Sequence, residues 1–221
     1  MKVWTRLQNR GAVNKENDMK NDNTATQRMT RGIKRIGCIT ALGLAFTVPL
    51  PPAASAQTVT PPPVPTGLEV DAPNEAFLLG HGVGTQNYVC QPAKSLGQVA
   101  WTLFTPQATL FSDEREQLIT HFASPNPDEG GVVRVTWEDS RDTSTVWAQA
   151  IAMATVNSTA IPWVKLQVVG AQDGPNGGKT LSGTTFIQRL NTEGGLAPKT
   201  GCDTPKDIGG KRFVPYTADY F

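Results

Sequence analysis

The chain has 221 residues, of which 38% are hydrophobic and 18% charged. Its basic residues gather near the N-terminus: nine Lys and Arg stand against three acids up to Ala56, which leaves 11 basic and 16 acidic residues, a net charge of −5, for residues 57–221. Because a protein that binds along a phosphate backbone needs a basic stripe, this mildly acidic remainder argues against a nucleic-acid-binding protein. Its length suits one domain that can bury its own core.

A secretory signal peptide is predicted well inside the sequence. Three basic residues between positions 31 and 35 precede an apolar run over residues 36–50, and the small-residue stretch 53–56 follows. Basic residues, an apolar core and then an A-x-A site are the order typical of export signals. Because spanning a bilayer takes roughly 20 apolar residues, the run is too short for a comfortable membrane span. We expect cleavage after Ala56, a secreted or periplasmic protein, and no stable membrane span after cleavage.

The segment before this signal does not resemble the start of a signal peptide, because residues 1–28 are polar and mixed in charge. Met29 begins a far better signal, so we expect translation to start there or at Met19. Residues 1–28 are then an extension of the gene model, and a genuine disordered n-region is the alternative. The expected organisation is a signal over 29–56, a proline-rich leader over 57–67 and a single β-domain over 68–221.

Two cysteines remain after signal cleavage, because Cys38 lies inside the apolar run and leaves Cys90 and Cys202. An even pair in an oxidising compartment is typical of a disulfide. The bridge would close a loop of over a hundred residues, which stabilises a fold by up to about 4–5 kcal/mol in the chain-entropy model. Two free or metal-bound thiols are the alternative, although the sequence has no C-x-x-C motif or Cys/His cluster.

From Leu68 onward, short apolar runs are separated by clusters of Gly, Pro, Asn and Asp, a pattern typical of strands and turns. Several runs alternate with period two, as in residues 164–168, where every second residue is apolar. The predicted strands are residues 76–79, 85–91, 99–104, 108–111, 117–122, 132–137, 145–152, 164–169 and 184–190, with a last short strand near 213–216.

Residues 146–155 are ambiguous, because their alanines favour a helix and their alternation of small with large residues favours a strand. We predict a strand here. Short strands at this spacing, without a clear long amphipathic helix, predict an all-β fold. The expected architecture is an antiparallel β-sandwich or barrel of about 8–10 short strands.

Several sequence stretches, taken in this order, resemble the secreted bacterial and fungal family known as domain of unknown function 3455. They are Asn74-Glu-Ala-Phe77, Gly84-Thr-Gln-Asn-Tyr-Val-Cys90, Trp101-Thr-Leu-Phe-Thr-Pro-Gln-Ala-Thr-Leu-Phe111, Ile119-Thr-His-Phe122, Ile161-Pro-Trp163, residues 186–198, Gly201-Cys202-Asp203 and Pro215-Tyr-Thr-Ala-Asp-Tyr220. The resemblance covers roughly residues 70–221. It implies a secreted all-β domain and assigns no catalytic residue.

Some fungal relatives in that family carry the label malate dehydrogenase, which this sequence does not support. A dinucleotide-binding fold needs G-x-G-x-x-G between a strand and a helix, so that the pyrophosphate lies at the helix N-terminus. Residues 80–84 read G-x-G-x-G and precede a predicted strand. We therefore expect no nicotinamide or other cofactor.

The chain has two histidines, His81 in a glycine-flanked turn and His121 late in a predicted strand. Either side chain could act as a general base or a metal ligand, because histidine titrates near neutrality. The alternative is structural: His121 hydrogen-bonded at the edge of the core and His81 filling a turn. The sequence contains no motif for a metal site and no G-x-S-x-G elbow of a serine hydrolase.

A polar cluster over residues 138–142 contains Asp139, Arg141 and Asp142 and lies between strands that carry Trp137 and Trp147. Such a loop could hold a sugar by aromatic stacking and carboxylate hydrogen bonds, or Ca²⁺ through oxygen ligands. The alternative is a hairpin turn with solvated or paired charges. The tryptophans of a β-protein normally pack in the core, and an exposed row of them would form a carbohydrate-binding face.

These features predict a non-enzymatic envelope or extracellular binding protein whose ligand is unknown, with a glycan or an envelope component as the expected class. The first alternative is a secreted hydrolase or metal-dependent enzyme that uses His81 or His121 with Asp139 or Asp142. The second is a structural surface protein without a small-molecule site.

Overall fold

The computed structural model of the protein describes residues 59–95 and 97–221. The predicted signal peptide, its cleavage site, both expected start positions and the first two residues of the leader lie outside the described residues. None of the helices in the described part is long and apolar enough to cross a membrane.

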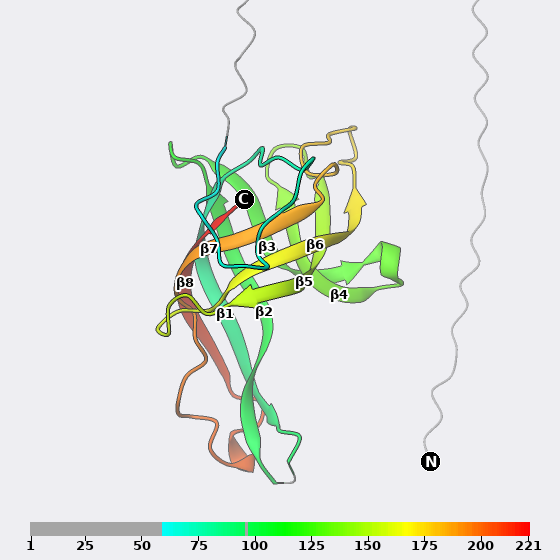
Figure 1. Ribbon diagram of the computed structural model, residues 1–221. Helices are drawn as coiled ribbons and strands as arrows, with labels where there is room; N and C mark the ends of the chain where they lie inside the picture. The colour runs from blue at the N-terminus through cyan, green and yellow to red at the C-terminus, as the bar shows by residue number, and fades with distance from the viewer. Residues whose placement is uncertain (1–58, 96) are drawn as a thin grey trace, which may run out of the picture. The chain divides into compact units, whose positions relative to one another are not determined.

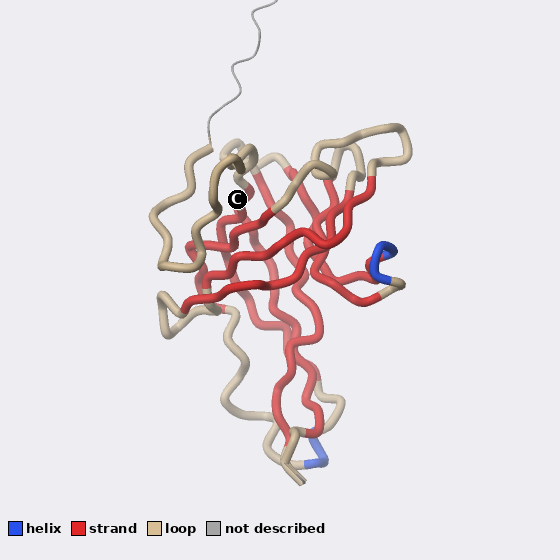
Figure 2. The backbone as a smooth tube through the Cα atoms, turned by 45° about the vertical axis from the view of Figure 1, so that its right-hand side comes forward, coloured by secondary structure: helices blue, strands red, loops and turns tan. Residues whose placement is uncertain are grey.

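The described residues form one antiparallel barrel, closed by pairing of the first strand with the last (Figures 1 and 2). The all-β prediction is confirmed, and of its two forms the barrel is the one observed. The eight strands follow one another around the barrel in chain order: β1 Gly80–Pro92, β2 Val99–Phe111, β3 Gln117–Asn126, β4 Val132–Asp139, β5 Thr145–Ala154, β6 Trp163–Gln172, β7 Phe186–Gly194 and β8 Lys211–Tyr220. Two short 3-10 turns, η1 Pro127–Glu129 and η2 Pro205–Asp207, lie in the connections.

The period-two pattern of the sequence is the pattern of burial in the barrel. In β6, Val164 and Leu166 point inward and are buried, while Lys165 between them lies on the outer face. The ambiguous residues 146–155 form most of β5, as predicted, with Val146 and Ala148 in the core. Because side chains alternate between the two faces of a strand, the inward-facing side chains of all strands together form the core of a small barrel.

Two local predictions are wrong. Residues 76–79 form no strand, and the separate strands predicted over 99–104 and 108–111 are one strand, β2. Pro106 lies between the two predicted strands, and in the structure it pairs with Gln86 near an irregularity in the β1–β2 register. Proline removes a ladder donor, and a neighbouring bulge is a place where a sheet tolerates that loss.

The G-x-G-x-G stretch at residues 80–84 is the beginning of β1, and its glycines face the barrel interior. A Cβ on Gly82 would lie 2.7 Å from the ring of Tyr220, and one on Gly84 would lie 2.1 Å from the carbonyl oxygen of Gln107. The glycines therefore let the β8 tyrosine and the β2 backbone approach β1 closely. This structural role accounts for the motif.

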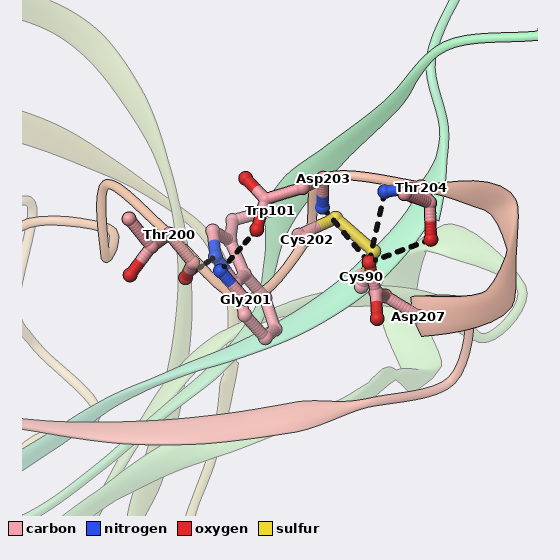
Figure 3. Close-up of a disulfide and its surroundings, with 8 residues drawn as sticks. All are labelled: Cys90, Trp101, Thr200, Gly201, Cys202, Asp203, Thr204 and Asp207. Atoms are coloured by element: carbon pink, nitrogen blue, oxygen red, sulfur yellow. Dashed lines mark hydrogen bonds between the residues drawn. A yellow bond between two sulfur atoms is a disulfide. The ribbon is translucent and has the colours of Figure 1, made fainter.

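Beyond the closed barrel, β1 and β2 continue as a long hairpin, seen below the barrel in Figure 1. We call residues 88–104 of this hairpin, without Leu96, together with residues 196–212, the arm. The predicted disulfide joins its two parts: Cys90 and Cys202 are bonded, with their Cα atoms 5.4 Å apart (Figure 3). Backbone hydrogen bonds between Cys90 and residues 209–210 lie next to the bridge.

Candidate functional site

A cavity of about 770 Å³ lies at one end of the barrel. We call it the mouth pocket. Seven of the eight strands contribute inward-facing residues to its wall: Gly80, Leu110, Ile119, Trp137, Val146, Ile187 and Tyr220. These positions are brought together by register, since Gly80 pairs with Tyr220, Leu110 with Ile119, and Trp137 with Val146.

Aromatic rings form the floor of the mouth pocket. The Trp137 ring stacks on His121 at 4.2 Å between centroids and meets Tyr220 edge-on at 6.0 Å. The His121 and Tyr220 rings lie 5.3 Å apart. Because each ring packs against the other two, the floor is held in one arrangement and presents an aromatic surface to the pocket.

The rest of the wall comes from outside the barrel strands. Residues 60–64 of the proline-rich leader, residues 69–70 and 74–78, and residues 181 and 183–185 contribute to the pocket lining. The sequence predicts a proline-rich leader ahead of the β-domain and a strand over residues 76–79, and neither prediction indicates that these residues line a pocket. Loop residues of this kind enclose a ligand without interrupting the barrel.

Several of the uncharged polar side chains in the mouth-pocket lining are already hydrogen-bonded within the protein. The Thr185 hydroxyl donates to Asn74, and the Gln188 amide donates to the backbone oxygen of Leu68. The charged side chains of the lining are acidic, Glu69 and Glu75. An apolar wall with a few hydrogen-bonding groups is the usual composition of a small-molecule site.

A second, much smaller cavity of about 50 Å³ lies inside the barrel and shares Trp137 and Tyr220 with the mouth pocket as wall. We call it the inner chamber. Its other polar wall residues are Gln86, His121 and Arg189. Sequence reasoning missed Gln86 and Arg189, although each occupies an inward position of its strand, Gln86 in line with Gly84 and Arg189 in line with Ile187.

His121 is 2% exposed, and its Nδ1–H donates to the backbone oxygen of Thr136 over 2.9 Å. Burial lowers the pKa of His121 to about 3, so the ring is neutral at ordinary pH. Because Nδ1 carries the proton, Nε2 is an unprotonated acceptor. The structure thus places His121 in the wall of the inner chamber, stacked on Trp137 and bonded to the backbone.

His81 lies on the other face of β1, where it bridges two carboxylates. Its Nδ1 is 2.7 Å from Asp219 on β8, and its Nε2 is 2.9 Å from Asp113 in the turn after β2. The hydrogen bonds to Asp113 and Asp219 raise the pKa of His81, although the side chain is 39% exposed. The bridge ties the closing strand pair to a neighbouring turn.

The polar cluster over residues 138–142 forms the turn between β4 and β5. Asp139 accepts backbone N–H bonds from Arg141 and Asp142 at 2.8 and 2.9 Å. Asp142 accepts from Ser144 and Thr180, and these bonds lower the pKa of its carboxyl, the Ser144 hydroxyl contributing most. Arg141 pairs with Glu116. Each of these side chains thus has its partner within or beside the turn.

Neither histidine has a hydrogen bond to Asp139 or Asp142. Trp137 and Trp147 point to opposite faces of the sheet, because Trp147 pairs with Thr136, the neighbour of Trp137. Trp147 donates to the Ser124 hydroxyl outside the barrel. Of the residues that sequence reasoning selected, only His121 and Trp137 meet in one cavity.

Within residues 59–95 and 97–221, no group of three or more His, Cys, Asp or Glu is placed to hold a metal ion. Comparison with protein families matches residues 72–221 to the family described as Protein of unknown function (DUF3455). No curated protein and no solved structure matches the chain.

Proposed function

The chain belongs to the family of proteins of unknown function DUF3455, and we propose that it is an extracellular binding protein that holds an uncharged, apolar small molecule in the mouth pocket. The single observation that carries this proposal is the pocket itself, an apolar hollow of about 770 Å³ opening at one end of a closed barrel. The predicted export signal supports the extracellular location.

The size of the mouth pocket fits a small molecule. Ligand sites typically measure about 300–1,000 Å³ and are lined mainly by hydrophobic and aromatic side chains. Here Leu110, Ile119 and Val146 supply the aliphatic wall, and Trp137 supplies a flat aromatic surface at its base. A ligand that covers these groups gains the free energy of removing apolar surface from water, about 25 cal/mol per Å².

The charge of the lining selects against anions. Glu69 and Glu75 line the mouth pocket, and none of the lining residues is Lys or Arg. An anionic ligand would therefore meet like charge from the lining residues themselves. Among the two expected ligand classes, an apolar envelope component fits this pocket better than a glycan, which is polar.

Binding of Nile red, an uncharged apolar dye, tests the proposal. The dye should gain fluorescence in the purified protein and lose about tenfold in affinity in Ala76→Trp, because position 76 lines the mouth and a tryptophan there fills it. Ala100→Trp is the matched control, since Ala100 is exposed on β2 outside the pocket lining. Equal loss in both variants, or no saturable binding to the unaltered protein, would contradict the proposal.

A further inference from the structure

The arm differs from the rest of the domain in charge. It holds five of the 11 basic residues and two of the 16 acidic residues of positions 57–221, a net charge of +3, so the remainder carries a net charge of −8. The basic side chains of the arm are all exposed: Lys94, Lys199, Lys206, Lys211 and Arg212. None of the ion pairs between described residues includes one of them. The two acids, Asp203 and Asp207, accept hydrogen bonds from backbone N–H groups of the arm itself.

Large apolar side chains are exposed beside these cations. Four lie in the arm and a fifth directly follows it, and they are between 40% and 60% exposed: Leu103, Phe104, Leu196, Ile208 and Phe213. The Cys90–Cys202 disulfide holds the two parts of the arm together, so both parts project from the barrel as one unit (Figures 1 and 3). Exposed apolar side chains gathered on one projection indicate a surface that contacts an apolar partner or a membrane.

Each face of the arm carries a cation beside an aromatic ring. The Lys211 Nζ atom lies 5.4 Å from the centroid of the Phe104 ring, and the guanidinium carbon of Arg212 lies 5.6 Å from that of Trp101. Lys211 and Arg212 are neighbours on β8, and successive side chains of a strand point to opposite faces. A flat protein surface would cover only one of these faces. A layer of lipid headgroups surrounds an arm that enters it end-on, so it contacts both.

We propose that the arm is a peripheral membrane anchor, whose end enters the headgroup layer of an anionic phospholipid bilayer. Charge complementarity selects this partner, because Lys and Arg side chains are attracted to anionic headgroups. Exposed aromatic and aliphatic side chains enter the boundary between headgroups and acyl chains, whereas an acidic polymer would leave them in water. The same surface repels the anionic remainder of the domain, which orients the protein with its arm toward the bilayer.

Membrane docking by the arm is distinct from ligand binding in the mouth pocket. Gly80, the first residue of β1, lines the pocket, and the arm begins at Tyr88, toward the other end of the same strand. The docked protein therefore holds its mouth pocket away from the bilayer. Nile red binding is measured without vesicles, so failure of the membrane anchor and failure of the proposed ligand site are separate results.

Co-sedimentation with vesicles tests the contribution of charge. Residues 57–221 should sediment with vesicles of equal parts phosphatidylglycerol and phosphatidylcholine, and should stay in solution with phosphatidylcholine alone. Lys211→Glu with Arg212→Glu should weaken binding at least about tenfold. The control is Arg115→Glu with Lys179→Glu, which makes the same change in net charge at exposed positions outside the arm, and it should weaken binding by less than about threefold.

Equal loss of binding in these two double variants, or no binding of the unaltered protein to the phosphatidylglycerol vesicles, would overturn the proposal. Unchanged Nile red affinity shows that the arm variant is folded. If it is not folded, Lys94→Glu with Lys206→Glu, at two other exposed positions of the arm, takes its place with the same expected loss.

A second variant separates a bilayer from an acidic polymer. Phe104→Ser should weaken binding to the phosphatidylglycerol vesicles several-fold, because it removes an exposed apolar ring of the arm. Val133→Ser is the matched control, since Val133 is 62% exposed and lies outside the arm, and it should bind as the unaltered protein does. If Phe104→Ser binds the vesicles unchanged and the protein binds immobilised polyglutamate equally well, the arm is a general polyanion site and the membrane proposal is wrong.

Discussion

The mouth of the barrel and the arm are stabilised by different interactions. At the mouth, β1 carries glycines, the wall is apolar and the strands enclose a hollow of about 770 Å³. In the arm there is no enclosed core: Leu103 and Phe104 are 46% and 40% exposed, and Lys211 and Arg212 lie over the rings of Phe104 and Trp101. The arm is fastened covalently by Cys90–Cys202.

This difference between the apolar hollow at the mouth and the disulfide-linked arm indicates that the mouth is the end suited to bind a ligand. A hairpin that cannot bury apolar surface needs a covalent or polar fastening, and the disulfide supplies it. The barrel has a shared core of buried residues below the hollow at its mouth. We therefore expect changes in the arm to alter stability without affecting ligand binding, and changes at the mouth to alter both.

The largest expected effect is in the arm. Replacing both cysteines, as Cys90→Ser with Cys202→Ser, opens a loop defined by a separation of 112 residues and should lower the free energy of unfolding by about 4–5 kcal/mol in the chain-entropy model. Urea unfolding measures this change. Nile red affinity should stay within a factor of about two below the unfolding transition. A loss of binding while the protein is folded would remove the distinction between the two ends.

The next effect is at β1. In Gly84→Ala the new Cβ would lie 2.1 Å from the Gln107 oxygen and 2.5 Å from the Ala108 Cα, both in the backbone of β2. Backbone cannot move aside cheaply, so we expect a loss of about 3 kcal/mol in the free energy of unfolding. Gly183→Ala is the control, because nothing lies within 4 Å of its Cβ position. Urea unfolding of the two variants should separate them, and similar stabilities would show that β1 and β2 are not packed as described.

The smallest expected effect concerns pH. The folded state raises the pKa of His81 through hydrogen bonds to Asp113 and Asp219, so it binds the proton more tightly than the unfolded state. This stabilisation is complete below about pH 6.5, the ordinary value, and is lost as pH rises through the folded pKa. His81→Gln should flatten that part of the stability profile. The disulfide of the arm does not titrate, so a variant lacking it should keep the slope.

Most strands could be predicted from the sequence, because the alternation of apolar and polar residues that marks a strand is a local pattern. It left sandwich and barrel open, since closure depends on β1 pairing with β8, which are far apart in the chain. β8 itself was expected to be a short strand near 213–216, and its pairing with β1 extends it to Lys211–Tyr220.

The candidate site was less predictable. Leu110, Ile119 and Val146 look like ordinary core residues in sequence, and they border a pocket only because register aligns them at the same end of the barrel. The leader lines the pocket through a tertiary contact that no local pattern encodes. Arg189 carried a detectable signal, since it is a charged residue at an inward position, in line with Ile187.

A crystal structure of the protein with Nile red would show whether the mouth pocket binds an uncharged apolar molecule. We expect dye density against the Trp137 ring, between Leu110 and Val146 and beneath residues 60–64 of the leader. Dye density confined to the exposed apolar side chains of the arm, with the mouth pocket holding only water, would contradict it.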